Sequence, residues 1–239
     1  TFLSDELRNA YAPSDRWLWD ETSYSCPPLI LDHAAKHLGY EAPERFVEAA
    51  HWSDIIDAAR FESVDQAIFG EDPALRISRS LTAAPTPAWV DEIAPALIDE
   101  SLHDVALRGD VEKAHDRAAR TRDKALEQFP PTVVWYEDGV VFYDASSSKV
   151  RRARFAPFYH HPECTYAVGV LPTRAGFHIT CGEHPWNPPE GGAHVGELRE
   201  RYGGGGHRAG GGANPPSLAK ARELGEEVAD EITRVLTGE

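Results

Sequence analysis

The sequence predicts a mixed α/β protein, with a helical first half and an α+β second half. Helical periodicity dominates the chain as far as Phe129, and short apolar segments of strand length follow Pro130-Pro131. A third observation is the glycine run of residues 203–212, in which seven of ten positions are glycine. With 41% hydrophobic and 10% aromatic residues, the 239-residue chain has enough apolar surface to bury a core.

Helices are expected through most of the first half, and turn residues mark their ends. Gly39 is a typical C-cap residue, and the Pro-rich stretch 83–87 breaks the helical pattern. Gly109-Asp110 indicates a further break, with Asp110 as an N-cap. The expected helices are Leu29–Leu38, Glu44–Phe61, Pro73–Leu81 and one or two helices within Trp89–Phe129.

Strands are expected after Pro131. The residues Glu137-Asp138-Gly139 form a turn signal between two apolar segments, which predicts a β-hairpin. The expected strands are Thr132–Tyr136, Val140–Tyr143, Tyr166–Leu171 and Gly176–Cys181, and the expected helices are Val195–Tyr202 and Ser217–Leu236.

The charge of the chain is unevenly distributed. The formal net charge is −15; residues 1–129 carry 25 acidic and 13 basic side chains, and residues 130–239 carry 14 and 11. This argues against a broad nucleic-acid surface, whereas the second half accommodates a short anionic ligand more easily. The three cysteines are widely spaced, and no apolar run reaches the roughly 20 residues of a membrane helix. We therefore expect reduced thiols in a cytoplasmic protein without a membrane partner.

The glycine run has the chemistry of an anion-binding loop. Four consecutive glycines let the backbone approach a ligand closely, and successive N–H groups form a concave nest for anions. The His-Arg pair that follows adds donors for phosphate oxygens. The run lacks the ending of a P-loop and the preceding strand of a dinucleotide fingerprint. Flexible linkers are also glycine-rich, but the flanking helical segments favour a phosphate-binding loop. The candidate substrate-binding residues are Gly203, Gly204, Gly205, Gly206, His207 and Arg208.

Residues 203–207, Gly-Gly-Gly-Gly-His, resemble the GGGH signature of the DHH-associated C-terminal domain in DHH-family phosphoesterases. In that family the glycine loop and its histidine hold the phosphate or terminal nucleotide of the substrate, which implies the same role here. The resemblance spans most of the chain and implies a two-domain protein. It divides the chain into a helical remnant of the catalytic domain (1–84), connector helices (85–129) and an α+β substrate-binding domain (130–239).

A second segment, Ser53–Phe61, resembles the end of the family's catalytic domain. The last metal aspartate of that domain lies in an Asp-Thr-Gly-like context before an aromatic residue. Asp57 falls on this position, with Ala58-Ala59 in place of Thr-Gly. The resemblance implies that Asp57 binds Mn²⁺ or Mg²⁺, because hard cations prefer oxygen ligands. Alternatively, Asp54 and Asp57 share a solvated helix face, since they lie three residues apart.

The other metal motifs of the family are absent from the sequence. No Asp-His-His or Asp-x-Asp precedes Asp57, and the chain starts at Thr1 without any methionine. We therefore expect a remnant that lacks the N-terminal nucleotide-fold portion, with catalytic residues upstream of Thr1. A two-metal centre needs several ligands, so this chain alone is expected to be inactive.

Family members often carry an arginine before the glycine loop that contacts substrate phosphate. The nearest positions here are Gly182 and Glu183, so this arginine is missing. One interpretation is that His184 or Asn187, in the following Pro-rich turn, replaces it. The other is that packing of Trp186 simply stabilises this turn.

Two functions are compatible with these observations. The first is a metal-dependent phosphoesterase that acts on a nucleotide or a short single-stranded oligonucleotide. Metal-activated water would attack phosphorus while the glycine loop holds the phosphate. The second is a non-catalytic nucleotide- or RNA-binding protein that has the substrate-holding domain but no metal centre. The exact substrate and the oligomeric state are left open.

Overall fold

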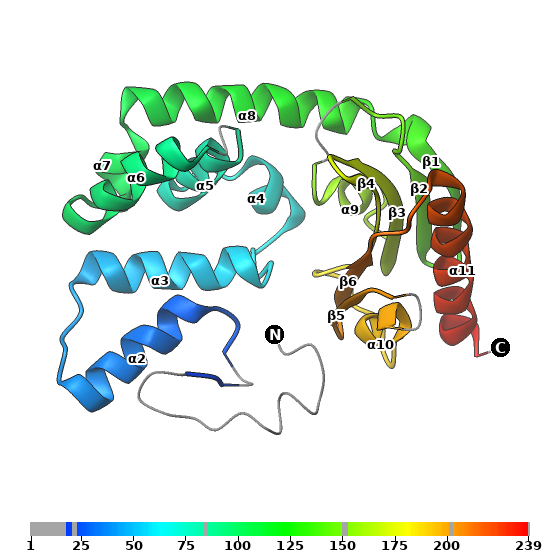
Figure 1. Ribbon diagram of the computed structural model, residues 1–239, viewed down its shortest axis with the longest axis horizontal. Coiled ribbons are helices and arrows are strands. Elements are labelled where there is room, and N and C mark those ends of the chain that lie inside the picture. The colour runs from blue at the N-terminus through cyan, green and yellow to red at the C-terminus, as the bar shows by residue number, and fades with distance from the viewer. Residues whose placement is uncertain (1–17, 21–22, 84–85, 150–152, 201–202, 239) are drawn as a thin grey trace. The chain divides into compact units, whose positions relative to one another are not determined.

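The chain is described from a computed structural model, which covers residues 18–20, 23–83, 86–149, 153–200 and 203–238. These residues form two compact units, the first within 1–62 and 69–120 and the second within 63–68 and 121–239 (Figure 1). Helices and a six-stranded sheet are both present, which confirms the mixed α/β class. The three cysteines are free thiols. No helix in the described ranges combines the length and apolarity needed to cross a membrane.

The first unit is helical, as predicted. Its expected long charged segment holds three helices rather than one or two, because Glu100 is extended and Ser101 caps a new helix. Asp110 is not an N-cap: the last of these helices begins at Gly109, and the Asp110 carboxylate accepts from its neighbour Val111 N at 2.8 Å. The helices are α2 (Cys26–Leu38), α3 (Glu44–Asp57), α5 (Pro73–Ala83), α6 (Pro87–Asp99), α7 (Leu102–Ala106) and α8 (Gly109–Glu127), whose last residues belong to the second unit.

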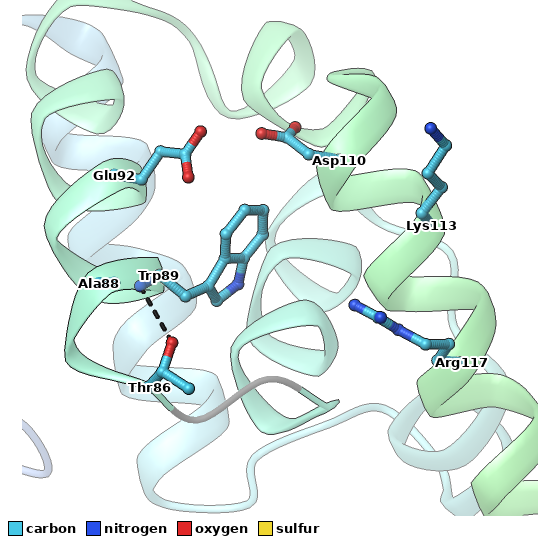
Figure 2. Close-up of a pocket in the computed structure, with 7 residues that line it drawn as sticks. All are labelled: Thr86, Ala88, Trp89, Glu92, Asp110, Lys113 and Arg117. Atoms are coloured by element: carbon cyan, nitrogen blue, oxygen red, sulfur yellow. Dashed lines mark hydrogen bonds between the residues drawn. The ribbon is translucent and has the colours of Figure 1, made fainter.

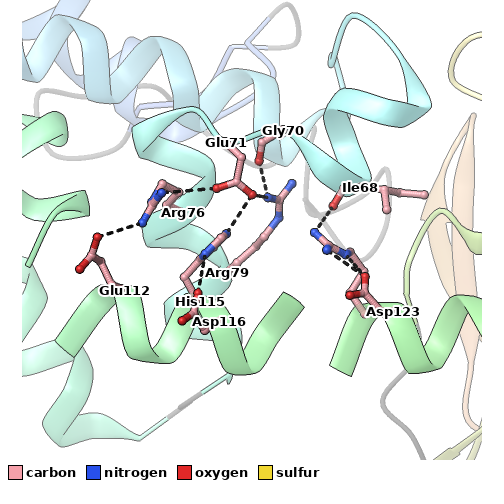
Figure 3. Close-up of polar contacts among 10 residues, drawn as sticks. Ile68, Gly70, Glu71, Arg76, Arg79, Glu112, His115, Asp116 and Asp123 are labelled. Carbon is pink, nitrogen blue, oxygen red and sulfur yellow. Dashed lines mark hydrogen bonds and ion pairs between the residues drawn. The ribbon is translucent and has the colours of Figure 1, made fainter. Parts of the chain in front are cut away.

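A polar cluster joins α5 to α8 beside the apolar core of the first unit (Figure 3). The Arg76 guanidinium lies 3.5 Å from a Glu71 carboxylate oxygen and 3.4 Å from one of Glu112. His115 is buried, with Nε2 3.5 Å from Glu71 Oε1. Burial lowers the pKa of His115, and nearby Arg76 acts in the same direction. The cluster therefore links α5, α8 and the segment before α5 through partly exposed ion pairs around the buried His115 ring.

The second unit contains a mixed sheet. In spatial order its strands are β1 (Val133–Glu137), β2 (Val140–Asp144), β3 (Tyr166–Thr173), β4 (Gly176–Glu183), β6 (Gly210–Ala213) and β5 (Gly205–His207). Only β2 and β3 are parallel among these neighbours. The unit also contains α4 (Val64–Phe69), a 3-10 turn (Pro130–Thr132), α9 (Ala156–His160), α10 (Val195–Glu200) and α11 (Leu218–Thr237). Phe69, the last residue of α4, belongs to the first unit.

The predicted β1–β2 hairpin is confirmed. Its turn residues Asp138 and Gly139 have φ angles of +46° and +82°, the left-handed pair of a type I′ turn. Across the two strands, the rings of Trp135 and Phe142 pack with centroids 5.6 Å apart. The hairpin thus begins the sheet as the sequence pattern indicated.

Helix α11 covers one face of the sheet and buries the main core (Figure 1). Ser217 caps the helix by accepting from Lys220 N. Gly225 lets the helix approach closely, since a Cβ there would lie 3.1 Å from Phe142 and Val170 side-chain atoms. The core residues that the strands contribute to this face are Val140, Phe142, Tyr166, Val168, Val170, Ile179 and Cys181.

Candidate functional site

The glycine run forms a β-hairpin at the edge of the sheet (Figure 1). Gly203 follows α10 with a φ of +72°, which turns the chain from helix to strand. Gly205 then pairs with Gly212, and His207 with Gly210. The sequence predicted a free loop here, because glycine has low strand propensity and leaves no alternation to read. Strand pairing occupies N–H groups that a free loop would leave for an anion.

Close backbone approach requires several of these glycines. A Cβ at Gly206 would lie 2.2 Å from Gly210 O, and one at Gly204 would lie 2.3 Å from Gly212 O. A Cβ at Gly205 would meet nothing within 4 Å. The run is therefore a packed structural element: Gly204 and Gly206 have no room for a side chain, whereas Gly205 does.

Hydrogen bonds from two sides fix the turn of the hairpin. Val195 N, at the start of α10, donates to Arg208 O at 2.8 Å. Glu183 N, at the end of β4, donates to Ala209 O, also at 2.8 Å. The turn is thus anchored by its backbone, while the side chains of His207 and Arg208 remain exposed.

The ring of His207 has a defined tautomer. Ala209 N donates to His207 Nδ1 at 3.3 Å, so the proton of the neutral ring is on Nε2. The Cε1 and Nε2 atoms lie 3.5 Å from where a Cβ of Gly210 would be, which places the ring over β6. His207 therefore offers an N–H donor, and Arg208, the next residue of the turn, has an exposed side chain; both are groups that can bind an anion.

The hairpin continues a sheet face lined by small side chains. Ile179 and Cys181 point into the core against α11, so their neighbours on β4 point to the opposite face. Residues paired across strands share that face. Its small members are Ala167, Gly169, Thr180, Gly182, Gly210 and Gly212. Tyr143 covers Gly169, whereas the part over β4, β6 and β5 is partly exposed. A ligand can approach this backbone closely.

The carboxyl group of Glu183 lies within electrostatic reach of the two exposed side chains of the turn. Partial burial raises the pKa of Glu183, and Arg208 and His207 oppose this rise. Glu183 occupies one of the two positions nearest the family's missing arginine. When ionised, it weakens the attraction of the turn for phosphate.

His184 and Asn187, the two residues considered as replacements for that arginine, make contacts within the protein. His184 is buried against Phe158 and Trp186, and its Nδ1 accepts from Trp186 N at 3.1 Å. Burial lowers its pKa, and no described group accepts from its Nε2. Asn187 Nδ2 donates to the carbonyls of residues 163 and 164, each at 3.2 Å. The turn therefore fits the packing interpretation.

The predicted metal ligand Asp57 is the last residue of α3, and it is exposed. Asp54 is engaged instead, accepting from Ser25 Oγ at 3.2 Å and pairing with Arg60 at 3.0 Å. Ala59, where the resemblance places glycine, has a φ of +56°. This is the left-handed conformation that glycine adopts without strain. Ala59 thus has a backbone conformation that a glycine at this position would adopt readily.

The described residues do not by themselves fit a metal centre. No group of three or more His, Cys, Asp or Glu side chains in the described ranges is arranged to hold a metal ion. Asp57 would supply one carboxylate of a set whose other members are not among these residues. Its role as a ligand stays a prediction.

A separate pocket lies in the first unit (Figure 2). It has a volume of about 380 Å³ and lies between α6 and α8. The Trp89 indole lines it together with the cationic side chains of Lys113 and Arg117 and the carboxylates of Glu92 and Asp110 (Figure 2). Its mixed charges do not select an anion, and none of its residues belongs to the glycine hairpin.

Sequence reasoning missed two polar residues of the small-residue face, His178 and Thr180. Both alternate along β4 with the buried Ile179 and Cys181. This alternation in Gly176–Glu183 was the signal that could have revealed them.

A solved phosphodiesterase has the fold of this chain. It is PggH, a pGpG-specific phosphodiesterase from Vibrio cholerae, with a TM-score of 0.66 and 18% sequence identity over 88% of this chain and 74% of that chain. This is the fold that the DHH-type resemblance implies. No protein-family model and no curated protein matches the sequence.

An exopolyphosphatase-related protein from Bacteroides fragilis is less similar. Its TM-score is 0.40, with 13% identity over 81% of this chain and 56% of that chain.

Proposed function

We propose that this chain belongs to a nucleotide-type phosphoesterase and that its glycine hairpin holds the substrate phosphate. The observation that carries the proposal is the exposed His207-Arg208 turn beside a face of small residues. The fold shared with a pGpG-specific phosphodiesterase supports it. A linear dinucleotide such as pGpG, or a short single-stranded oligonucleotide, is the substrate class that we propose.

The residues of the turn would have distinct roles. Nε2–H of His207 donates to a phosphate oxygen, and the Arg208 guanidinium binds the same group in bidentate fashion. Gly210 and Gly212 let the sugar-phosphate backbone lie close to β6. Together these groups hold and orient the phosphate, while the hydrolytic step itself is not assigned to any described residue.

Metal dependence forms part of the proposal through Asp57. A bound Mn²⁺ or Mg²⁺ would supply an activated water and would neutralise developing charge. A single exposed carboxylate gives weak affinity, so further ligands must come from outside the described residues. The rival function is a nucleotide-binding protein without a metal centre.

Calorimetric titration with pGpG tests the phosphate site. We expect His207→Ala to weaken binding by one to two decades, because a charge-assisted hydrogen bond contributes ~1.5–3 kcal/mol. Arg208→Ala should also weaken it. Arg174→Ala, at the exposed β3–β4 turn, is the matched control and should bind like the wild type. Unchanged affinity in both hairpin variants would remove the turn from the site.

A hydrolysis assay separates the two functions when it is made on the full-length protein, because the described residues alone do not complete a metal centre. Cleavage of pGpG that requires Mn²⁺ supports the phosphoesterase. Binding of pGpG without cleavage, at any Mn²⁺ concentration tested, supports the binding protein.

A further inference from the structure

A second imidazole lies on the small-residue face, beside His207. A Cβ at Gly212 would lie 2.4 Å from Cε1 and 2.6 Å from Nε2 of His178, so this ring lies directly over β6. The ring of His207 lies over Gly210, two residues along the same strand. Same-face neighbours on a strand are about 7 Å apart, which is on the scale of one nucleotide.

The two rings expose opposite hydrogen-bonding groups. His178 Nδ1 lies 2.9 Å from Asn214 Oδ1, an acceptor, so Nδ1 carries the proton and the neutral ring has its lone pair on Nε2. In His207, Nδ1 accepts and Nε2 donates. His207 thus suits a phosphate oxygen, and His178 suits a ligand N–H or O–H.

The surroundings of His178 leave its ring open to a ligand. The ring occupies space that any side chain at residue 212 would fill, and Gly212 leaves it free. His178 is only half-buried, and its partner Asn214 is exposed. The pair is therefore accessible from the same side as His207.

We propose that His178, oriented by Asn214, accepts a hydrogen bond from the nucleoside whose phosphate His207 holds. This inference rests on the proposed function, and it makes His178 a specificity-determining residue. The donor is a nucleobase N–H or a sugar hydroxyl. Guanine presents N–H donors on its pairing edge, where adenine N1 presents a lone pair, and a 2′-deoxy sugar lacks one hydroxyl donor.

Titrations with pGpG, pApA and 2′-deoxy pGpG test the inference on the wild type, His178→Phe and His178→Gln. Phe keeps a flat ring but removes the acceptor, so we expect pGpG affinity to fall about 3- to 10-fold. Gln places an amide oxygen near the position of Nε2 and should retain most of the affinity. Asn214→Ala should give an intermediate loss.

The ligand preference that His178→Phe loses shows whether the base or the sugar donates the hydrogen bond to His178. If the base supplies it, His178→Phe loses the preference for pGpG over pApA; if the sugar supplies it, the variant loses the preference for ribose over deoxyribose. Unchanged affinity and discrimination in His178→Phe, with binding still lost in His207→Ala, would overturn this inference alone. Failure of the wild type to bind any of the three dinucleotides would overturn the proposed function as well. A melting curve like that of the wild type shows that each variant is folded.

Discussion

Gly206→Ala should damage ligand binding far more than Gly205→Ala, although the two glycines are adjacent. The added methyl at residue 206 would lie 2.2 Å from Gly210 O and 2.5 Å from Gly211 Cα, both backbone atoms. Ordinary contact begins near 3.4 Å, so β5 and β6 must separate by about 1 Å. Overpacking of this kind costs about 1–3 kcal/mol.

The separation would displace the turn that carries His207 and Arg208. About 1.4 kcal/mol of binding free energy is a tenfold change in affinity, so a loss of about 1–3 kcal/mol would weaken pGpG binding to Gly206→Ala by about 5- to 150-fold. Gly205→Ala meets open space and should bind like the wild type. Calorimetric titration of both variants, with circular dichroism to confirm folding, measures the difference. Equal affinities in two folded variants would refute the steric argument.

Three further predictions concern electrostatics and the backbone. Glu183→Gln should tighten pGpG binding by about two- to fivefold, because it removes a negative charge that repels phosphate. In the wild type, affinity for pGpG should rise as pH falls toward the raised pKa of Glu183. If the affinity of Glu183→Gln depended on pH as much as that of the wild type, this prediction would be contradicted. His184 has a lowered pKa, so its contribution to stability is present above its ordinary value of about 6.5 and is lost as pH falls through the lowered value. Urea unfolding at pH 7.5 and 5.5 should therefore show that the free energy of unfolding falls less in His184→Gln than in the wild type as pH is lowered. An equal fall in both proteins would contradict this role of His184. Gly139→Ala should lower stability by about 1–3 kcal/mol in thermal unfolding, because φ is +82° and a Cβ would lie 2.9 Å from Thr165 Oγ1; an unchanged melting temperature would be inconsistent with this.

Much of the second unit could be predicted from local sequence. Asp138-Gly139 specifies a left-handed turn by itself, and the apolar alternation on either side specifies the strands. Ser217 and the apolar stripe of α11 likewise mark a helix without reference to the rest of the chain. These signals are local, so the sequence contains them directly.

The hairpin of the glycine run could not be predicted in the same way. Its strands exist because Gly204 and Gly206 allow backbone contacts with residues 210–213, and because β4 offers an edge for pairing. Neither cause leaves a periodic pattern in a run of glycines. The sequence indicated the chemistry of His207 and Arg208, but not the strand pairing that positions them.

The role of His178 also depends on nonlocal structure. Its significance comes from Gly212 and Asn214, which lie 34 and 36 residues further along the chain. Only the pairing of β4 with β6 brings them together. The first unit shows the reverse case: the pattern around Asp57 is local, but the further ligands that the predicted metal site would need are not among the described residues.

The most direct test of the phosphate-binding hairpin is a titration of ¹⁵N-labelled protein with pGpG, followed by amide chemical shifts. We predict that the largest saturable shifts fall on the amides of Gly204–Gly212 and on Glu183, whose N–H is bonded to the turn. Saturable shifts confined to the first unit, around Trp89 and Lys113 in the separate pocket, would contradict the account. So would the absence of any saturable shift.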